Sequence, residues 1–151
     1  MNTIIVYTSL TGNTELMAES IAHELTRLGE KVELKDAFNT GVVELKDYDR
    51  ILVGSYTWGD GDLSDEIMDF YDELQNVDLT GKMAAAFGAG DSYYEHFAGA
   101  VDILEETLKN QGCEIGTESL KIDINTDEDI QGKCKFFVGK LTKAPQLAGK
   151  A

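Results

Sequence analysis

The chain has 151 residues, of which 42% are hydrophobic and 27% charged, a composition typical of one globular domain spanning residues 1–151. Its 13 Lys and Arg residues against 28 Asp and Glu residues give a formal charge of −15, which disfavours nucleic acid and anionic membranes as partners. No apolar run approaches the ~20 residues of a membrane-spanning helix and no secretory leader pattern precedes the first strand, so we expect a cytoplasmic, monomeric protein.

Short apolar runs alternate with stretches of helical periodicity along the chain. The runs predict strands at Thr3–Thr8, Lys31–Asp36, Arg50–Ser55, Lys82–Gly88 and Cys113–Ile124. The periodic stretches predict helices at Asn13–Leu28, Ser64–Gln75, Phe97–Asn110 and Asp127–Lys143, whereas Asn39–Tyr48 shows no clear pattern. Several strands are apolar at every position, as parallel strands buried on both faces are. We therefore expect an α/β fold with a doubly wound, five-stranded parallel sheet and helices on both faces.

The first unusual loop follows the first predicted strand and reads Thr8-Ser9-Leu10-Thr11-Gly12-Asn13-Thr14. It combines four hydroxyl side chains with one Gly and one Asn, and it contains no Lys or Arg. A single Thr would suffice to cap the following helix, so this density of hydroxyl groups favours a second role. The loop predicts a phosphate site held by hydroxyl and backbone N–H groups at a helix N-terminus.

The second unusual loop, Tyr56-Thr57-Trp58-Gly59-Asp60-Gly61-Asp62, follows the third predicted strand and holds the only Trp of the chain. A core Trp normally lies within an apolar stripe, whereas this one has polar and glycine neighbours. We interpret it as a flat binding surface. The two glycines allow the peptide planes beside it to rotate at little steric cost.

The third loop, Gly88-Ala89-Gly90-Asp91-Ser92-Tyr93-Tyr94-Glu95, follows the fourth strand with two aromatic side chains. Its start does not continue into GxGxxG, which argues against a dinucleotide-binding domain, and the absence of GxxxxGK[ST] argues against a nucleoside-triphosphate hydrolase. Loops at the carboxyl ends of parallel strands meet at one edge of the sheet. Together they predict a site for a planar, phosphorylated heteroaromatic cofactor, which would itself carry the redox chemistry.

Three motifs in this order resemble the short-chain flavodoxins, over essentially the whole chain. They are Ser9-Leu10-Thr11-Gly12-Asn13-Thr14, Thr57-Trp58-Gly59-Asp60 and Gly90-Asp91-Ser92-Tyr93-Tyr94-Glu95. The resemblance implies the strand order 2-1-3-4-5 and FMN as the cofactor. It also implies a low-potential carrier that moves single electrons between the semiquinone and hydroquinone forms, rather than a turnover enzyme.

Carried over position by position, the resemblance implies a role for each loop. The first loop would hold the FMN phosphate, Trp58 would cover the inner face of the flavin and Tyr94 the outer face. The peptide between Gly59 and Asp60 would rotate on one-electron reduction. A small residue usually stands where Tyr93 does, which leaves open which tyrosine stacks, although the spacing from Asp91 favours Tyr94. The implied cofactor-binding residues are Ser9, Leu10, Thr11, Gly12, Asn13, Thr14, Tyr56, Thr57, Trp58, Gly59, Asp60, Ala89, Gly90, Asp91, Tyr94 and Phe97.

A stretch without Lys or Arg runs from Ile51 to Gly81 and is rich in carboxylates. It is either a solvated helix face or a docking surface for basic redox proteins, such as a flavodoxin or ferredoxin reductase and downstream acceptors. The carboxylates of this acidic face are Asp60, Asp62, Asp65, Glu66, Asp69, Asp72 and Glu73.

Two other functions are compatible with this fold class. A flavin-dependent NAD(P)H:quinone reductase would need insertions for which the chain has little length. A signalling receiver domain would need acidic residues where Tyr7-Thr8 and Gly54-Ser55 stand. Cys113 and Cys134 are predicted to be buried thiols, and with His23 and His96 they form no metal-ligand pattern, so we expect no metal.

Overall fold

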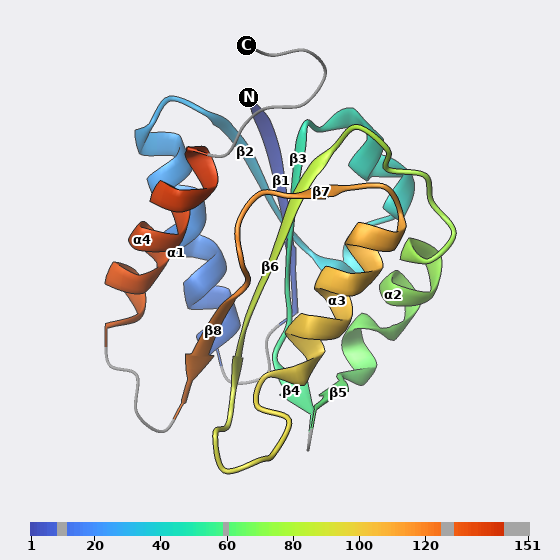
Figure 1. Cartoon of the computed structure of the whole chain (residues 1–151). Helices are drawn as coiled ribbons and strands as arrows, with labels where there is room; N and C mark the ends of the chain where they lie inside the picture. Colours follow the sequence, from blue (N-terminus) through green and yellow to red (C-terminus); the bar gives the residue numbers. More distant parts are fainter. Residues whose placement is uncertain (9–11, 59–60, 125–128, 144–151) are drawn as a thin grey trace.

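The computed structural model of the protein describes residues 1–8, 12–58, 61–124 and 129–143, with the side chain of Trp58 left out (Figure 1). Residues 9–11, 59–60, 125–128 and 144–151 lie outside this description. No helix among the described residues is long and apolar enough to cross a membrane.

A parallel sheet forms the centre of the molecule. Its neighbouring strands run in the order β2 (Lys31–Asp36), β1 (Asn2–Tyr7), β3 (Arg50–Gly54) and β6 (Met83–Gly90). The fifth position is shared by β7 (Glu114–Ile115) and β8 (Leu120–Asp123), which both pair with β6. The predicted doubly wound α/β fold with strands ordered 2-1-3-4-5 is therefore confirmed.

The prediction of one continuous strand over Cys113–Ile124 was wrong. The chain pairs with β6 at Glu114 and Ile115, leaves the sheet, and pairs again from Leu120 opposite Phe87. The segment between the two pieces, residues 116–119, reads Gly-Thr-Glu-Ser and has no apolar side chain to bury against either sheet face. A further departure is the antiparallel hairpin of β4 (Thr57–Trp58) and β5 (Asp62–Leu63), which lies within the second loop.

Helices cover both faces of the sheet (Figure 1). On one face α1 (Asn13–Arg27) packs beside α4 (Ile130–Thr142), and on the other α2 (Met68–Leu74) lies beside α3 (Gly99–Asn110). Short 3₁₀ helices occupy Ala37–Asn39, Val42–Asp47 and Asp65–Ile67. The segment without a clear pattern and the start of the predicted helix Ser64–Gln75 are therefore wound more tightly than an α-helix.

Helix ends follow local backbone preferences. α1 and α3 are each followed by a glycine at positive φ, Gly29 at 88° and Gly112 at 99°, as the sequence predicts for C-terminal caps. α3 begins at Gly99 rather than at Phe97, because Ala98 adopts a left-handed conformation with φ of 51°. Phe97 nevertheless packs against the core from the loop before the helix.

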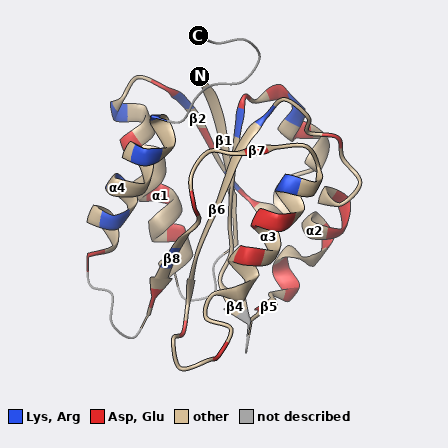
Figure 2. Ribbon diagram, viewed as in Figure 1, with Lys and Arg blue, Asp and Glu red and all other residues tan. Residues whose placement is uncertain are grey.

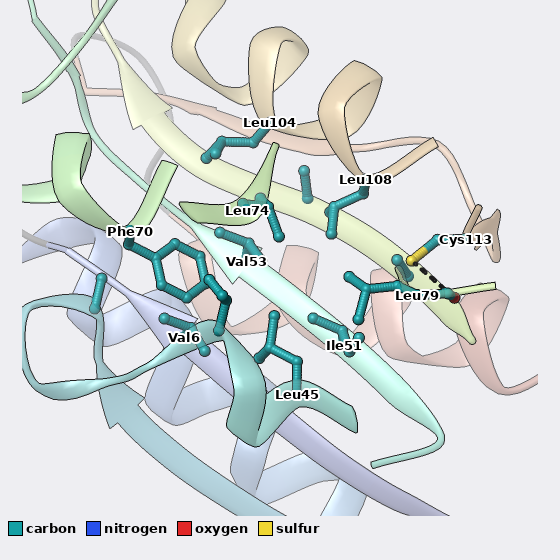
Figure 3. Close-up of a cluster of buried hydrophobic side chains, with 14 of the residues drawn as sticks. Val6, Leu45, Ile51, Val53, Phe70, Leu74, Leu79, Leu104, Leu108 and Cys113 are labelled. Atoms are coloured by element: carbon teal, nitrogen blue, oxygen red, sulfur yellow. Dashed lines mark hydrogen bonds between the residues drawn. The ribbon is translucent and has the colours of Figure 1, made fainter. Parts of the chain in front are cut away.

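Two layers of apolar side chains hold these helices on the sheet. One lies under α2 and α3 and includes Val53, Phe70 and Leu104 (Figure 3). The other lies under α1 and α4 and is centred on Phe87, whose ring occupies the space that a side chain at position 54 would need. Both layers reach the carboxyl ends of β1, β3 and β6, so they fix the positions from which the three loops leave the sheet.

Both cysteines are free and buried, as predicted. Burial raises the pKa of the Cys113 thiol to about 11 and that of Cys134 to about 12. Cys113 Sγ lies 3.9 Å from the carbonyl oxygen of Leu79, within the layer under α3 (Figure 3).

Candidate functional site

The three predicted loops leave the sheet at one edge, beyond the carboxyl ends of β1, β3 and β6 (Figure 1). After β1 the chain crosses to β2 on one side, and β3 then lies on the other side of β1. The strand order therefore reverses between β1 and β3. In open α/β sheets such a switch point is where ligands bind.

The base of the first loop is tied to its neighbour by hydrogen bonds. The backbone N–H of Thr8 donates to the carbonyl oxygen of Gly54 over 3.0 Å, and the buried hydroxyl of Thr8 donates to Ser55 Oγ over 3.3 Å. Ser55 in turn donates its N–H to Phe87 O over 3.1 Å. The first, second and third loops thus start from a connected row of residues.

The far side of the first loop fits a phosphate group. Gly12 has φ of 92°, which a side chain would disfavour, and Asn13 begins α1. Thr14 is 1% exposed, and its Oγ1 has no hydrogen-bond partner among the described residues. A buried hydroxyl is stabilised only when it is hydrogen-bonded. This hydroxyl stands in the first turn of a 15-residue helix, where the partial positive charge of the helix favours an anion.

The second loop is held by hydrogen bonds at its base, which we call its neck and which comprises Tyr56, Thr57 and Glu66. Tyr56 is 9% exposed and donates its phenol O–H to Glu66 Oε2 over 2.5 Å. On the opposite side, the backbone N–H of Ala100 donates to Thr57 Oγ1 over 3.3 Å, which ties the loop to the first turn of α3. Burial raises the pKa of Tyr56, and the hydrogen bond from the phenol lowers the pKa of the Glu66 carboxyl.

The second and third loops meet through glycines. Gly61 has φ of 99°, and a Cβ placed on it would lie 2.7 Å from His96 Cβ. A Cβ on Gly99 would lie 2.8 Å from the Cα atom of Gly61, and one on Gly90 would lie 2.8 Å from Ala98. The backbones approach too closely for side chains at these positions, so the two loops pack as one unit.

The third loop turns back on itself around Asp91. The Asp91 side chain accepts a hydrogen bond from Tyr93 N over 2.9 Å, and its carbonyl oxygen accepts one from Tyr94 N over 3.1 Å. Asp123, at the end of β8, accepts from Ser92 N over 3.3 Å. Tyr93 is 85% exposed and Tyr94 46% exposed, so Tyr94 lies closer to the body of the protein.

Most of the residues predicted for the cofactor site lie at this one edge. The described ones are Gly12, Asn13, Thr14, Tyr56, Thr57, Trp58 by its backbone, Ala89, Gly90, Asp91, Tyr94 and Phe97. Five predicted residues lie outside the described residues, namely Ser9, Leu10, Thr11, Gly59 and Asp60. Three residues that anchor the loops were not predicted for the cofactor site. Glu66 was predicted only for the acidic face, and Ala100 and Asp123 join the site from distant elements and carry no local motif.

Carboxylates dominate the surface beside the site. Asp62, Asp65, Glu66, Asp69, Asp72 and Glu73 are all exposed on β5, the following 3₁₀ turn and α2. The opposite flank differs, since α4 carries three lysines and no Asp or Glu (Figure 2). No group of three or more His, Cys, Asp or Glu side chains in the described part of the chain is placed to hold a metal ion.

The fold and the site define a doubly wound α/β protein with a ligand site at its switch point. The family model for flavodoxin matches residues 5–137. The chain is 42% identical over 141 residues to probable flavodoxin 2 of Bacillus subtilis, covering 93% of each chain. The structure of oxidised flavodoxin 2 from Bacillus cereus is 42% identical, with a TM-score of 0.89 over 95% of this chain and 99% of that one.

The chain belongs to the flavodoxin family, whose members are small electron-transfer proteins that bind FMN. A more distant structural relative is a Fusobacterium nucleatum flavodoxin mutant bound to flavin mononucleotide. It is 20% identical, with a TM-score of 0.83 over 95% of this chain and 96% of that one.

Proposed function

We propose that this chain binds FMN at the edge of the sheet where its three loops meet and passes single electrons between basic redox proteins. The observation that carries the proposal is the buried, unpartnered hydroxyl of Thr14 beside Gly12 at the start of α1. A phosphate oxygen would supply the missing hydrogen-bond partner. FMN, when bound, supplies the one-electron chemistry, for which side chains have no equivalent.

The loops divide the binding of FMN between them. Residues 9–14 would hold the phosphate with hydroxyl and N–H groups. Trp58 would cover the inner face of the ring and Tyr94, the less exposed of the two neighbouring tyrosines, the outer face. Ala89, Gly90 and Asp91 would line the pyrimidine edge, and Tyr56, Thr57 and Phe97 would support these contacts. The peptide between Gly59 and Asp60 would accept the hydrogen bond of the reduced ring.

The potential would be set mainly by the stacked aromatic side chains and the exclusion of water. A unit negative charge ~10 Å from the ring opposes a second electron by only about 0.4 kcal/mol in water. This corresponds to roughly 18 mV for a one-electron couple, and salt reduces it further. The surrounding carboxylates therefore contribute tens of millivolts, and Trp58 and Tyr94 must contribute more.

The acidic face, comprising Asp60, Asp62, Asp65, Glu66, Asp69, Asp72 and Glu73, would receive the partners. A cleft of about 370 Å³ lies between the Phe38–Gly41 turn and the carboxylates of Glu66, Asp69 and Glu73. Phe38, which is 78% exposed, forms part of its wall. A basic side chain of a reductase or acceptor would find both carboxylates and an aromatic ring there.

The alternative function, an NAD(P)H:quinone reductase on the same fold, is not favoured. Probable flavodoxin 2 of Bacillus subtilis has nearly the same length as this chain, and the match covers 93% of each, which leaves little chain for a nicotinamide pocket. Three expectations stay predictions from the sequence: a single domain over residues 1–151, a monomeric state and a cytoplasmic location.

Replacing the proposed inner stacking residue tests this function. Trp58→Ala should weaken FMN binding and raise the midpoint potential of the second one-electron reduction, because water would reach the ring. Phe136→Ala, which removes a 69% exposed aromatic side chain from α4, serves as the control and should leave both unchanged. An unchanged potential in Trp58→Ala would contradict the assignment of Trp58.

A further inference from the structure

We propose that the Tyr56–Glu66 hydrogen bond is a clasp that positions the flavin-facing loop, so that Tyr56 and Glu66 are positioning residues for the redox site. This inference rests on the proposed FMN function. Tyr56 stands directly before β4, and Glu66 stands three residues after β5. The bond between their side chains therefore closes the neck of the hairpin that carries Trp58.

The position of Tyr56 fits this role better than direct contact with a ligand. Its side chain is 9% exposed, and its O–H is directed to Glu66 Oε2 over 2.5 Å. The aromatic body of Tyr56 is thus held within the protein while its only polar atom is engaged at the surface of the 3₁₀ turn Asp65–Ile67. The phenol of Tyr56 acts through the loop rather than on the flavin.

The clasp matters because the two strands of the hairpin are short. Among the described residues, β4 and β5 are two residues long each and pair through Thr57 with Leu63 and Trp58 with Asp62. An isolated two-stranded hairpin is marginally stable in water. A bond between residues 56 and 66 shortens the free segment and reduces the entropy that binding would otherwise cost.

The clasp acts on one side of the neck, and α3 acts on the other. Ala100 N donates to Thr57 Oγ1 over 3.3 Å, and Gly99 lies against Gly61. The second anchor is made by the backbone of α3. The Tyr56–Glu66 clasp depends on two side chains, so substitutions can remove it without changing the backbone anchor.

Four FMN-loaded variants and the wild-type protein separate a hydrogen-bonded clasp from a charge effect. Tyr56→Phe and Glu66→Ala both remove the bond, and each should weaken FMN binding about fivefold and raise the midpoint potential of the second electron. Glu66→Gln keeps an acceptor oxygen but no charge, and it should stay within about twofold of the wild type. Glu106→Ala removes an equal charge from an exposed position of α3, outside the acidic face, and should behave like the wild type.

A matched control tests whether any lost phenol hydroxyl has the same effect. Tyr48→Phe alters a half-buried tyrosine two residues before β3, at the amino-terminal end of that strand, and should change neither the affinity nor the potential. If Tyr56→Phe does not fold, Glu66→Ala alone carries the test, since Glu66 is exposed.

Three results would overturn the clasp. The first is wild-type behaviour of Tyr56→Phe and Glu66→Ala. The second is a Glu66→Gln variant as impaired as Glu66→Ala, which would assign the effect to charge. The third is weaker binding in Tyr56→Phe with an unchanged potential, which would make Tyr56 purely structural. Failure of the wild-type protein to bind FMN in the same titration would instead refute the proposed function.

Discussion

Gly61 and Gly99 pack backbone against backbone at the junction of the second and third loops, with a Cβ on Gly99 placed 2.8 Å from Gly61 Cα and 3.0 Å from its carbonyl oxygen. Gly61 lies in the turn that follows Trp58, and Gly99 is the first residue of α3. The position of the Trp58 loop therefore depends on the absence of a side chain on the neighbouring helix.

Gly99→Ala should lower the free energy of unfolding by about 1–3 kcal/mol and weaken FMN binding, because the new methyl group displaces the second loop. Gly139→Ala in α4 is the control, since nothing lies within 4 Å of where its Cβ would stand. It should stabilise the protein by about 0.5–1 kcal/mol through helix propensity. Urea unfolding of both apoproteins measures these two changes in the free energy of unfolding, which should have opposite signs. Equal stability of the two variants would refute the steric argument.

A buried ion pair supports the edge of the sheet away from the site. Arg50 is 2% exposed, and its Nη1 lies 2.6 Å from Glu30 Oε1. Glu30→Gln should lower the free energy of unfolding by about 3 kcal/mol, because it leaves a buried guanidinium without its counter-charge. The double variant Glu30→Gln/Arg50→Met should be more stable than the single one, as urea unfolding can show. FMN affinity should not change, and a large loss of affinity would contradict the separation of this edge from the site.

The buried thiols predict a loss of stability at alkaline pH. The pKa of Cys113 is about 11 and that of Cys134 about 12, both raised from 9.0 by burial. Above pH 9 the unfolded chain releases these protons while the folded chain keeps them. The contribution of the buried thiols to the free energy of unfolding is therefore fully present below pH 9. Above pH 9 it falls by about 1.4 kcal/mol per pH unit for each cysteine, until the pH reaches the pKa of the folded state.

Urea unfolding between pH 8 and 11 measures this slope. A Cys113→Ala/Cys134→Ala variant should show a shallower decline, because tyrosine and lysine titration alone then remains. Equal slopes in the two proteins would show that the thiols are not responsible.

The acidic face predicts electron transfer that depends on ionic strength. Asp65→Asn/Asp69→Asn/Asp72→Asn should slow reduction of cytochrome c, a basic one-electron acceptor, about tenfold at low salt. Glu19→Gln/Glu33→Gln/Asp47→Asn makes the same change in net charge elsewhere and should have a much smaller effect. Stopped-flow rates at low and high ionic strength test this. Equal effects of the two triple variants would indicate a general charge effect instead of a docking surface.

The sequence was sufficient where local patterns determine structure. The strands buried on both faces, the helical stripes and the capping glycines Gly29 and Gly112 were all predicted, and so was the meeting of three loops at one edge. The division of the fifth strand was not predicted, because the apolar pieces on both sides of Gly116 read as one strand. The polar segment Gly-Thr-Glu-Ser at residues 116–119 is where the pairing with β6 is interrupted, and the apolar residues on both sides concealed this break.

The anchors of the site were equally beyond prediction. Tyr56 could be assigned to the loop from its motif, but its hydrogen bond to Glu66 depends on a hairpin whose strands have two residues each. Such short strands leave no alternating pattern. The contact between Ala100 and Thr57 joins residues 43 positions apart and also has no sequence signal.

Titration of the apoprotein with FMN and with riboflavin, followed by flavin fluorescence, tests the central claim most directly. Two charge-assisted hydrogen bonds to the phosphate at about 1.5 kcal/mol each predict that FMN binds at least about 100-fold more tightly than riboflavin. Thr14→Val should reduce this preference by removing the buried hydroxyl. Equal affinities for the two flavins, or no binding of FMN, would contradict the account.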